Sequence, residues 1–130
     1  MIEAKQIINS SHAPAAVGTY SQAIKTGNIV FLSGQIPLNP ITMTLVEGNM
    51  EKQVIQILDN LSAVATAAGG SLDHIVRLSI YLTNMNDFPI INTVMTQYFK
   101  EPYPARSTIG VNALPKGALV EMDAIMVLST

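Results

Sequence analysis

The sequence predicts an α+β domain in which two helices cover one face of a sheet of five or six strands. Two observations carry this prediction: apolar residues repeat with a helical period in two segments, and they alternate with a period of two in several others. Turns rich in glycine and proline separate these segments, and no internal repeat interrupts them. A chain of 130 residues has the size of one domain, so residues 1–130 are expected to fold as a single unit.

The first predicted elements form a β-hairpin. Residues Ile29 to Gln35 are a short β-rich run after a Thr26-Gly27-Asn28 turn, so they are expected to pair with Ser21 to Lys25. The segment from Pro37 to Pro40 that follows is predicted to be a loop, because proline lacks the N–H donor that a strand needs.

Two helices are predicted from apolar stripes of period 3.6. The first begins at Met50 behind Asn49 as N-cap and ends at Gly69, and the second begins at Asp87 and ends before Pro102. The expected core-facing residues are Met50, Val54, Ile57, Leu58, Leu61, Val64 and Ala68 in the first helix, and Phe88, Ile91, Met95 and Phe99 in the second. Pro89 is tolerated in the first turn of the second helix.

Three further strands complete the predicted sheet. Ile75 to Leu82 alternates, with Val76, Leu78, Ile80 and Leu82 on its apolar side. Two strands after residue 104 are predicted to be joined by Leu114-Pro115-Lys116-Gly117, which suits a type I turn. One face of the last strand, from Ala118 to Leu128, is purely apolar, and its other face is partly so. Because two helices shield only one side of the sheet, the other side is expected to pack on another subunit.

Arg106 is the most prominent candidate functional residue, because it is one of only two arginines and lies outside any charged run. Its guanidinium is permanently charged and presents a planar fork of donors that suits a carboxylate. If the turn closes a tight hairpin, Glu121 lies opposite Gly110 and shares a face with Arg106 and Thr108. A group of this kind could hold a water molecule or a small acid.

Composition excludes several classes of site. The absence of cysteine excludes disulfides, thiolate metal sites and a cysteine nucleophile, and His12 and His74 show no metal-ligand spacing. Charged residues make up 12% of the chain, the net charge is -2, and the seven basic residues form no stripe of the kind that binds nucleic acid. No apolar run approaches the roughly 20 residues of a membrane helix, so a soluble cytoplasmic protein is expected.

Several motifs resemble one known family. The run from Tyr103 to Ser107, followed by Val111, Leu114-Pro115-Lys116, Glu121 and Ala124-Ile125, closely resembles the signature of the RidA (YjgF) family of imine deaminases. Further matches occur in the expected order, and they cover nearly the whole chain: Ala13-Pro14-Ala15-Ala16, Gly18, Tyr20, Ser33-Gly34-Gln35-Ile36-Pro37, Leu58-Asp59-Asn60, Ala67-Ala68-Gly69, Asn86-Asp87-Phe88 and Asn92.

This resemblance implies a chorismate-mutase-like mixed sheet and a homotrimer with three ligand sites at subunit interfaces. It also implies hydrolysis of 2-imino acids, such as 2-iminobutanoate and 2-iminopropanoate, to 2-oxo acids and ammonia, without a metal or cofactor. Enzymes that use pyridoxal phosphate release these imines, which inactivate other such enzymes if they persist.

The resemblance also assigns roles to residues. Arg106 is implied to bind the substrate carboxylate and Glu121 to position water, while the pocket is implied to be lined by Tyr20, Ser33, Gly34, Asn92 and Thr108. Thr108 stands where the family often has cysteine and keeps a hydroxyl for a water contact, so the change is expected to tune activity. Thr19 stands where many members have proline, and it bears on the placement of the neighbouring tyrosine.

Other interpretations remain open. From spacing alone, Arg106 could be a structural ion-pair partner, Glu121 part of a solvated strand face, Tyr20 a packing residue and Asn92 an exposed amide. A rival function is a trimeric protein that binds small carboxylates and regulates a partner with little turnover. Relatives of this family have also been linked to translation inhibition, RNA cleavage and chaperone-like behaviour, but the acidic balance of the chain argues against RNA.

Overall fold

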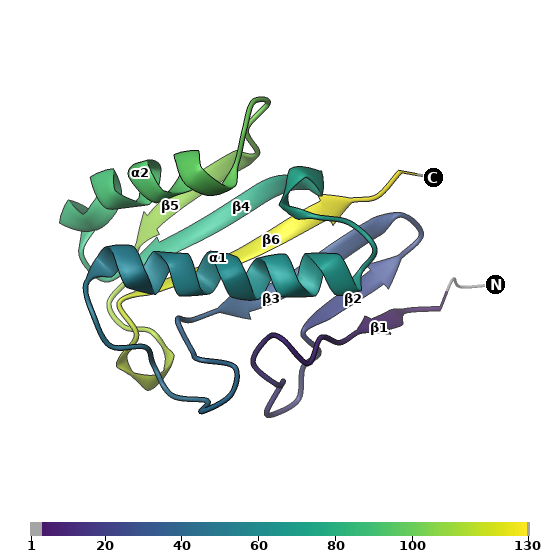
Figure 1. Cartoon of the computed structure of the whole chain (residues 1–130), viewed down its shortest axis with the longest axis horizontal. Coiled ribbons are helices and arrows are strands. Elements are labelled where there is room, and N and C mark those ends of the chain that lie inside the picture. Colours follow the sequence, from purple (N-terminus) through teal and green to yellow (C-terminus); the bar gives the residue numbers. More distant parts are fainter. Residues whose placement is uncertain (1–3, 130) are drawn as a thin grey trace.

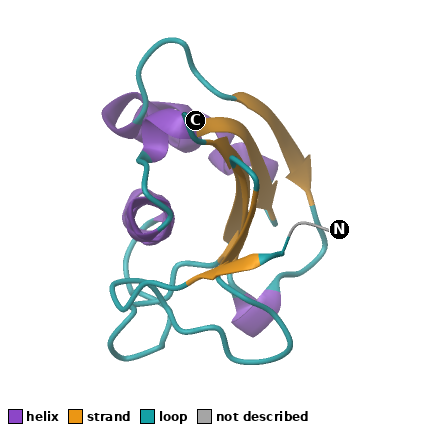
Figure 2. Ribbon diagram, turned by 90° about the vertical axis from the view of Figure 1, so that its right-hand side faces the viewer, coloured by secondary structure: helices purple, strands orange, loops and turns teal. Residues whose placement is uncertain are grey.

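The computed structural model describes residues 4–129, in which both α-helices lie on the same face of one sheet (Figure 1 and Figure 2). The elements are β1 (Gln6–Ile8), β2 (Ala23–Thr26), β3 (Ile29–Gln35), α1 (Met50–Ala67), β4 (Ile75–Leu82), α2 (Phe88–Tyr98), β5 (Ala105–Gly110) and β6 (Val120–Val127). The six strands follow the order β1-β2-β3-β6-β4-β5, and every neighbouring pair is antiparallel except β4 and β5. The predicted α+β fold, a mixed sheet with two helices on one face, is confirmed.

The predicted hairpin and helices are present. β2 and β3 pair antiparallel around the expected turn, with Thr26 opposite Ile29. The Asn49 side chain caps α1 by accepting a 3.0 Å hydrogen bond from the backbone N–H of Lys52. The chain leaves this helix through Gly69, whose φ of +96° is left-handed and therefore favours glycine.

The core lies between the two helices and the sheet. All seven residues predicted for the first helix are buried, and Val94 joins the predicted stripe of the second helix, in which Phe88 is only half-buried. The apolar face of the last strand is buried as predicted, at Ala118, Val120, Met122, Ala124, Met126 and Leu128. Neither described α-helix is long and apolar enough to cross a membrane.

The predicted hairpin between the last two strands is wrong. β4 lies between β5 and β6, so β5 and β6 do not touch along the ladder. The physical reason is the crossover through α2, which returns the chain parallel to β4 and makes β5 its neighbour. The segment before β6 forms a short 3₁₀ turn, Pro115–Gly117, in which Lys116 and Gly117 have left-handed φ angles of 57° and 72°.

One side chain of β4 also departs from the prediction. Val76 was expected on the apolar side of its strand, but it is 48% exposed, whereas Ile75 is buried. The ladder between β4 and β6 shifts register between Ile75 and Arg77, so an extra residue bulges out at this point. Simple alternation of side chains holds only from Leu78 onward.

The face of the sheet without α-helices carries exposed apolar side chains. Ile29 and Phe31 of β3 and Ile109 of β5 are 38%, 47% and 49% exposed. They accompany half-buried residues such as Ile125, which lies opposite Phe31 in the ladder. This face, called the open face below, therefore offers apolar surface that the two helices do not cover.

Candidate functional site

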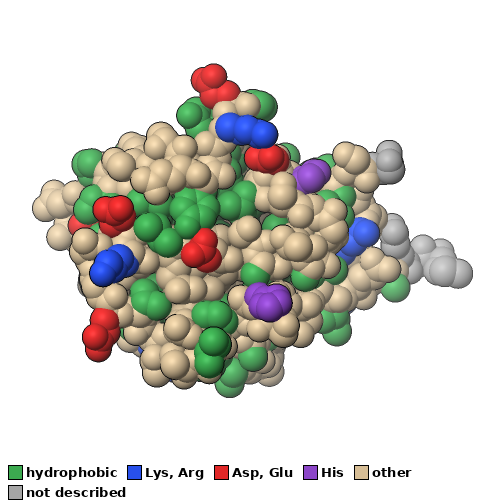
Figure 3. Space-filling view, in the orientation of Figure 1, with side chains coloured by type: hydrophobic (Ala, Val, Ile, Leu, Met, Phe, Trp, Pro, Cys, Tyr) green, Lys and Arg blue, Asp and Glu red, His purple; other side chains and the backbone are tan. Residues whose placement is uncertain are grey.

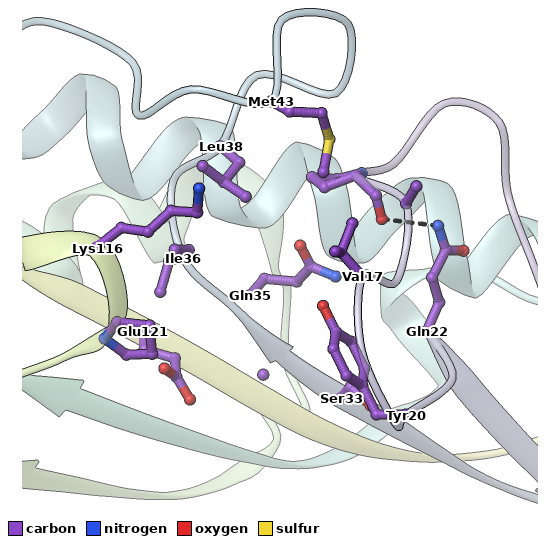
Figure 4. Close-up of a pocket in the computed structure, with 14 residues that line it drawn as sticks. Val17, Tyr20, Gln22, Ser33, Gln35, Ile36, Leu38, Met43, Lys116 and Glu121 are labelled. Atoms are coloured by element: carbon purple, nitrogen blue, oxygen red, sulfur yellow. Dashed lines mark hydrogen bonds between the residues drawn. The ribbon is translucent and has the colours of Figure 1, made fainter.

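A cavity of about 650 Å³ opens at one end of the sheet (Figure 4). Its wall is built by the loop before β2, the end of β3 with the loop that follows, and the turn that leads into β6. Its apolar lining consists of Pro14, Ala15, Val17, Ile36, Leu38, Met43 and Pro115. Its polar and charged lining residues are Tyr20, Gln22, Ser33, Gln35, Lys116 and Glu121, together with Gly34. This size and mixture are typical of small-molecule sites, which measure roughly 300–1,000 Å³.

Glu121 enters this cavity beside Gly34. A Cβ atom added to Gly34 would stand 3.0 Å from Cδ of Glu121 and would clash with its Oε2. Gly34 lies where the ladder between β3 and β6 shifts register, between Leu32 and Gln35. A glycine at this bulge thus leaves the space that the carboxylate of Glu121 occupies.

The environment of Glu121 favours its protonated form. Burial raises the pKa of Glu121, and the negative charge of Asp123, two residues along the same strand, raises it further. Asp123 is itself fixed, because the hydroxyl of Tyr81 donates a 2.9 Å hydrogen bond to its Oδ2. This hydrogen bond is in turn the main cause of a raised Tyr81 pKa. Glu121 is therefore poised to exchange a proton at a higher pH than an ordinary glutamate.

Ser33 and Gln22 hold the loop that carries Tyr20. The Ser33 hydroxyl donates a 2.6 Å hydrogen bond to the carbonyl of Ser21, and its backbone N–H donates to the carbonyl of Gln22. The buried amide of Gln22 donates to the carbonyl of Pro14 at 2.9 Å, a contact drawn in Figure 4. Tyr20 is 54% exposed and directs its hydroxyl toward the cavity (Figure 4).

Arg106 lies in a different place, in the layer between β5 and α2. Its Nη1 is 3.1 Å from Sδ of Met95, and its guanidinium carbon is 5.2 Å from the centre of the Phe88 ring. The one ion pair formed among residues 4–129 joins Lys100 and Asp73, so no carboxylate in this part of the chain neutralises Arg106. The guanidinium is half-buried and packed in place, yet its charge has no counterion there.

Thr108 and Asn92 accompany Arg106. Oγ1 of Thr108 is buried and has no hydrogen-bond partner among the described residues. Asn92 is exposed on α2, one helical turn from both Phe88 and Met95, the two residues that contact the guanidinium. The residues expected to bind substrate thus divide into a cavity group of Tyr20, Ser33, Gly34 and Glu121, and an edge group of Arg106, Thr108 and Asn92.

The two groups lie on opposite faces of the sheet. Arg106 pairs with Leu78, which faces the helices, whereas Glu121 pairs with Tyr81 on the open face. The prediction that Glu121 shares a face with Arg106 and Thr108 is therefore wrong for a single chain. Its premise was a hairpin register, and β4 separates the two strands instead. Gly110 faces Met85 rather than Glu121, since an added Cβ would stand 3.3 Å from Cγ of Met85.

Two features of the cavity were not predicted from the sequence. Gln35 is buried at its inner wall, and Lys116 lines its mouth in a left-handed conformation that few residues other than glycine adopt. The sequence did contain an indication of Gln35, because a polar side chain at the end of an apolar strand is unusual. Nothing in the sequence indicated the left-handed backbone of Lys116. No cluster of three or more His, Asp or Glu residues that could hold a metal ion occurs within residues 4–129.

Comparison with known proteins places this geometry in a family. The family model described as Endoribonuclease L-PSP matches residues 10–128. The chain belongs to this family. It is the RidA (YjgF) family that the sequence motifs indicated, so that prediction is confirmed.

Relatives of this chain carry several names. A 2-iminobutanoate/2-iminopropanoate deaminase of Dermatophagoides farinae is 45% identical over 95% of this chain and 97% of its own length. The crystal structure of RidA from a Psychrobacter bacterium superposes with a TM-score of 0.91 at 47% identity, covering 95% of this chain and 99% of that one. Escherichia coli TdcF, solved with bound serine, superposes at 0.90 with 40% identity, covering 96% and 100%. Other relatives are named only as RutC family proteins.

Proposed function

We propose that this protein hydrolyses reactive 2-imino acids, such as 2-iminobutanoate and 2-iminopropanoate, to 2-oxo acids and ammonia, and so protects enzymes that use pyridoxal phosphate. The observation that carries the proposal is the unneutralised guanidinium of Arg106, held in place against Met95 and Phe88. Such a group suits the carboxylate that every 2-imino acid carries. The deaminase of Dermatophagoides farinae, 45% identical to this chain, supports the same reaction.

The site is proposed to form between subunits of a homotrimer. Arg106 and Glu121 lie on opposite faces of the sheet, so one small acid that contacts both needs a second copy of the chain. The exposed apolar side chains of the open face favour association, because burying apolar surface is the main driving force for it. Each of three sites would then combine the cavity group of one copy with the edge group of the next.

In this arrangement the substrate carboxylate binds Arg106 and the imine carbon lies near Glu121. The substrate reacts as its protonated imine: the Glu121 carboxylate takes a proton from a water molecule while the water oxygen bonds to the imine carbon, and the carbon–nitrogen π electrons move to nitrogen, giving a neutral carbinolamine. Protonated Glu121 then returns this proton to the amino group and the carbon–nitrogen bond breaks. Ammonia leaves and takes up the hydroxyl proton as the carbonyl of the 2-oxo acid forms, so the products are the 2-oxo acid and ammonium. A raised pKa suits both halves of this transfer, because Glu121 must accept and then release the same proton near neutral pH.

The other predicted site residues have supporting roles in the proposal. Gly34 leaves space for the Glu121 carboxylate, and Ser33 fixes the loop that presents Tyr20 to the substrate. The unpartnered Oγ1 of Thr108 has a free hydrogen-bonding capacity that a water molecule could use. Asn92, exposed on α2 one helical turn from Phe88 and Met95, is proposed to contact the carboxylate as well.

One observation favours the second candidate function, a regulatory protein that binds small carboxylates with little turnover. TdcF was solved with bound serine, which is an amino acid and not an imine. The family description and the names of some relatives instead mention endoribonuclease activity. The surface argues against RNA, because basic side chains on the helix-bearing face are scattered (Figure 3) and the net charge is -2.

The test is an assay of imine hydrolysis coupled to threonine dehydratase. The wild-type protein is expected to accelerate release of 2-oxobutanoate, and Arg106→Ala to return it to the spontaneous rate. Arg106→Lys tests whether the planar fork is needed beyond its charge, and Lys100→Ala, which removes an exposed cation, serves as the matched control. Full acceleration by Arg106→Ala would refute the proposal, and binding of 2-oxobutanoate without acceleration by the wild type would favour the regulator.

A further inference from the structure

The side chain of Arg106 forms one hydrogen bond within residues 4–129, and its acceptor is the sulfur of Met95. Met95 lies on α2 and is only 5% exposed, so its sulfur belongs to the packed core. Sδ of Met95 is 3.1 Å from Nη1 of Arg106, and the centre of the Phe88 ring is 5.2 Å from the guanidinium carbon. Helix α2 therefore supplies both groups that orient this guanidinium.

A thioether is an unusual partner for an arginine. Sulfur is a weak acceptor without charge, whereas a carboxylate forms a hydrogen bond with arginine that is roughly twice as strong as a neutral one. The contacts with Met95 and Phe88 thus orient the guanidinium and leave its charge unneutralised. A carboxylate that arrives with a substrate displaces the weak bond to sulfur easily.

The benefit of this contact is that Arg106 is oriented before a ligand arrives. Arginine is among the side chains that lose the most rotamer freedom when they are fixed in one conformation. Fixing one such side chain at the moment of binding lowers the affinity for the ligand roughly two- to tenfold. An arginine that folding has already oriented spares the ligand this loss of affinity.

We propose that Met95 is a positioning residue, whose sulfur fixes the Arg106 guanidinium before the substrate carboxylate binds. The inference rests on the proposed function, because Arg106 is the group proposed to bind that carboxylate. The property that matters is the acceptor atom and not the volume of the side chain. An uncharged, weak acceptor holds the arginine without competing with the substrate.

Three substitutions at position 95 separate the acceptor from the volume. Met95→Leu removes the acceptor and keeps the volume, Met95→Gln provides an uncharged acceptor oxygen, and Met95→Glu provides a carboxylate. In the assay coupled to threonine dehydratase, KM is expected to rise about fivefold in Met95→Leu. It should stay within about twofold of the wild type in Met95→Gln and rise at least about tenfold in Met95→Glu, whose carboxylate occupies the guanidinium.

The value of kcat distinguishes this role from a general loss of structure. In Met95→Leu it is expected to stay within about twofold of the wild type, because the bound carboxylate then orients the guanidinium itself. Met126→Leu, which changes a buried methionine of β6, is the matched control and should keep the wild-type KM. If Met95 acted only through packing, both polar variants would be impaired more than Met95→Leu.

Nuclear magnetic resonance measures the orientation of Arg106 without turnover. The chain has only two arginines, so their Nε–H groups give two signals, and Arg77 provides the internal reference. In the wild type without ligand, the order parameter of Arg106 Nε–H is expected to be that of a rigid group. In Met95→Leu it should fall below about 0.6 while that of Arg77 stays unchanged, and saturating 2-oxobutanoate should restore it.

The outcomes separate this proposal from the proposed function. An Arg106 order parameter that is unchanged in Met95→Leu overturns the role of Met95, as does a KM that rises no further in Met95→Leu than in Met126→Leu. If the wild type accelerates no imine hydrolysis, the deaminase function fails, while the order parameters and the affinity for 2-oxobutanoate, measured by calorimetry, still decide the role of Met95. Met95→Leu conserves volume, so its comparison with Met126→Leu holds even if a polar variant does not fold.

Discussion

If each site takes Arg106 from one subunit and Glu121 from another, two inactive variants should restore activity when they share a trimer. Arg106→Ala removes the carboxylate anchor, and Glu121→Gln removes the proton acceptor while keeping the shape of the side chain. Each variant alone is expected to lose nearly all acceleration of imine hydrolysis. A mixed trimer contains some sites in which the intact arginine of one copy meets the intact glutamate of its neighbour.

The expected recovery follows from the arrangement of the two groups on opposite faces of the sheet. With equal amounts and random assembly, the copy that supplies the arginine to a site has an intact Arg106 in about half of the cases. The copy that supplies the glutamate to the same site has an intact Glu121 in about half of the cases. About one quarter of the sites are therefore complete, and activity should reach about one quarter of the wild-type value. If both residues acted from the same chain, the mixture would remain inactive.

The assay mixes the two variants by co-expression, verifies mixed trimers by native mass spectrometry and measures 2-oxobutanoate release with threonine dehydratase. Doubly mutated chains mixed with the wild type provide the control, because they dilute sites without complementing them. Mixed trimers with no recovered activity would refute the shared site. A wild-type protein that is monomeric under the assay conditions would refute it as well.

Three further predictions concern the cavity and the helix layer. Gly34→Ala should displace the Glu121 carboxylate and lower kcat/KM about 10²-fold, with an unchanged circular dichroism spectrum; wild-type kinetics would contradict the close contact. Burial and the charge of Asp123 raise the pKa of Glu121, so the acidic limb of the kcat/KM profile against pH should lie above the usual glutamate pKa. In Asp123→Asn this limb should move to lower pH. If it does not move, the charge of Asp123 does not act on Glu121. Burial and a 2.8 Å hydrogen bond to Asp59 raise the pKa of Tyr98 to about 12. In an ultraviolet titration this tyrosine should therefore ionise near pH 12 in the wild type and at lower pH in Asp59→Asn. Identical titration curves for the two proteins would argue against the hydrogen bond.

Local features of the fold were accessible from the sequence because single residues determine them. Asn49 and Gly69 mark the ends of α1 through a side-chain cap and a left-handed backbone, and both effects belong to the residue itself. The alternation of β6 predicted its buried face correctly for the same reason. Each of these predictions needed only the neighbours along the chain.

The order of the strands was not accessible in this way. Leu114 to Gly117 has the composition of a tight turn, yet it lies between two strands that are not neighbours in the sheet. The crossover through α2 has already placed β5 on the far side of β4, so β4 separates β5 from β6. The error carried into the site, where Arg106 and Glu121 were placed on one face. Family motifs suggested the candidate site residues, but they contain no information on which face each residue occupies.

The bulge at Ser33 and Gly34 divides β3 into two halves that obey opposite rules of alternation. Before it, odd-numbered positions face outward, and after it Gln35 faces inward. Two consecutive residues, Ser33 and Gly34, therefore occupy the part of the strand where a regular strand would have one. For protein engineering, this makes chain length here as important as residue identity: removing one of the two residues would restore a regular ladder with Gln35 still opposite Met122, and inserting one elsewhere in the strand would move every later position to the other face.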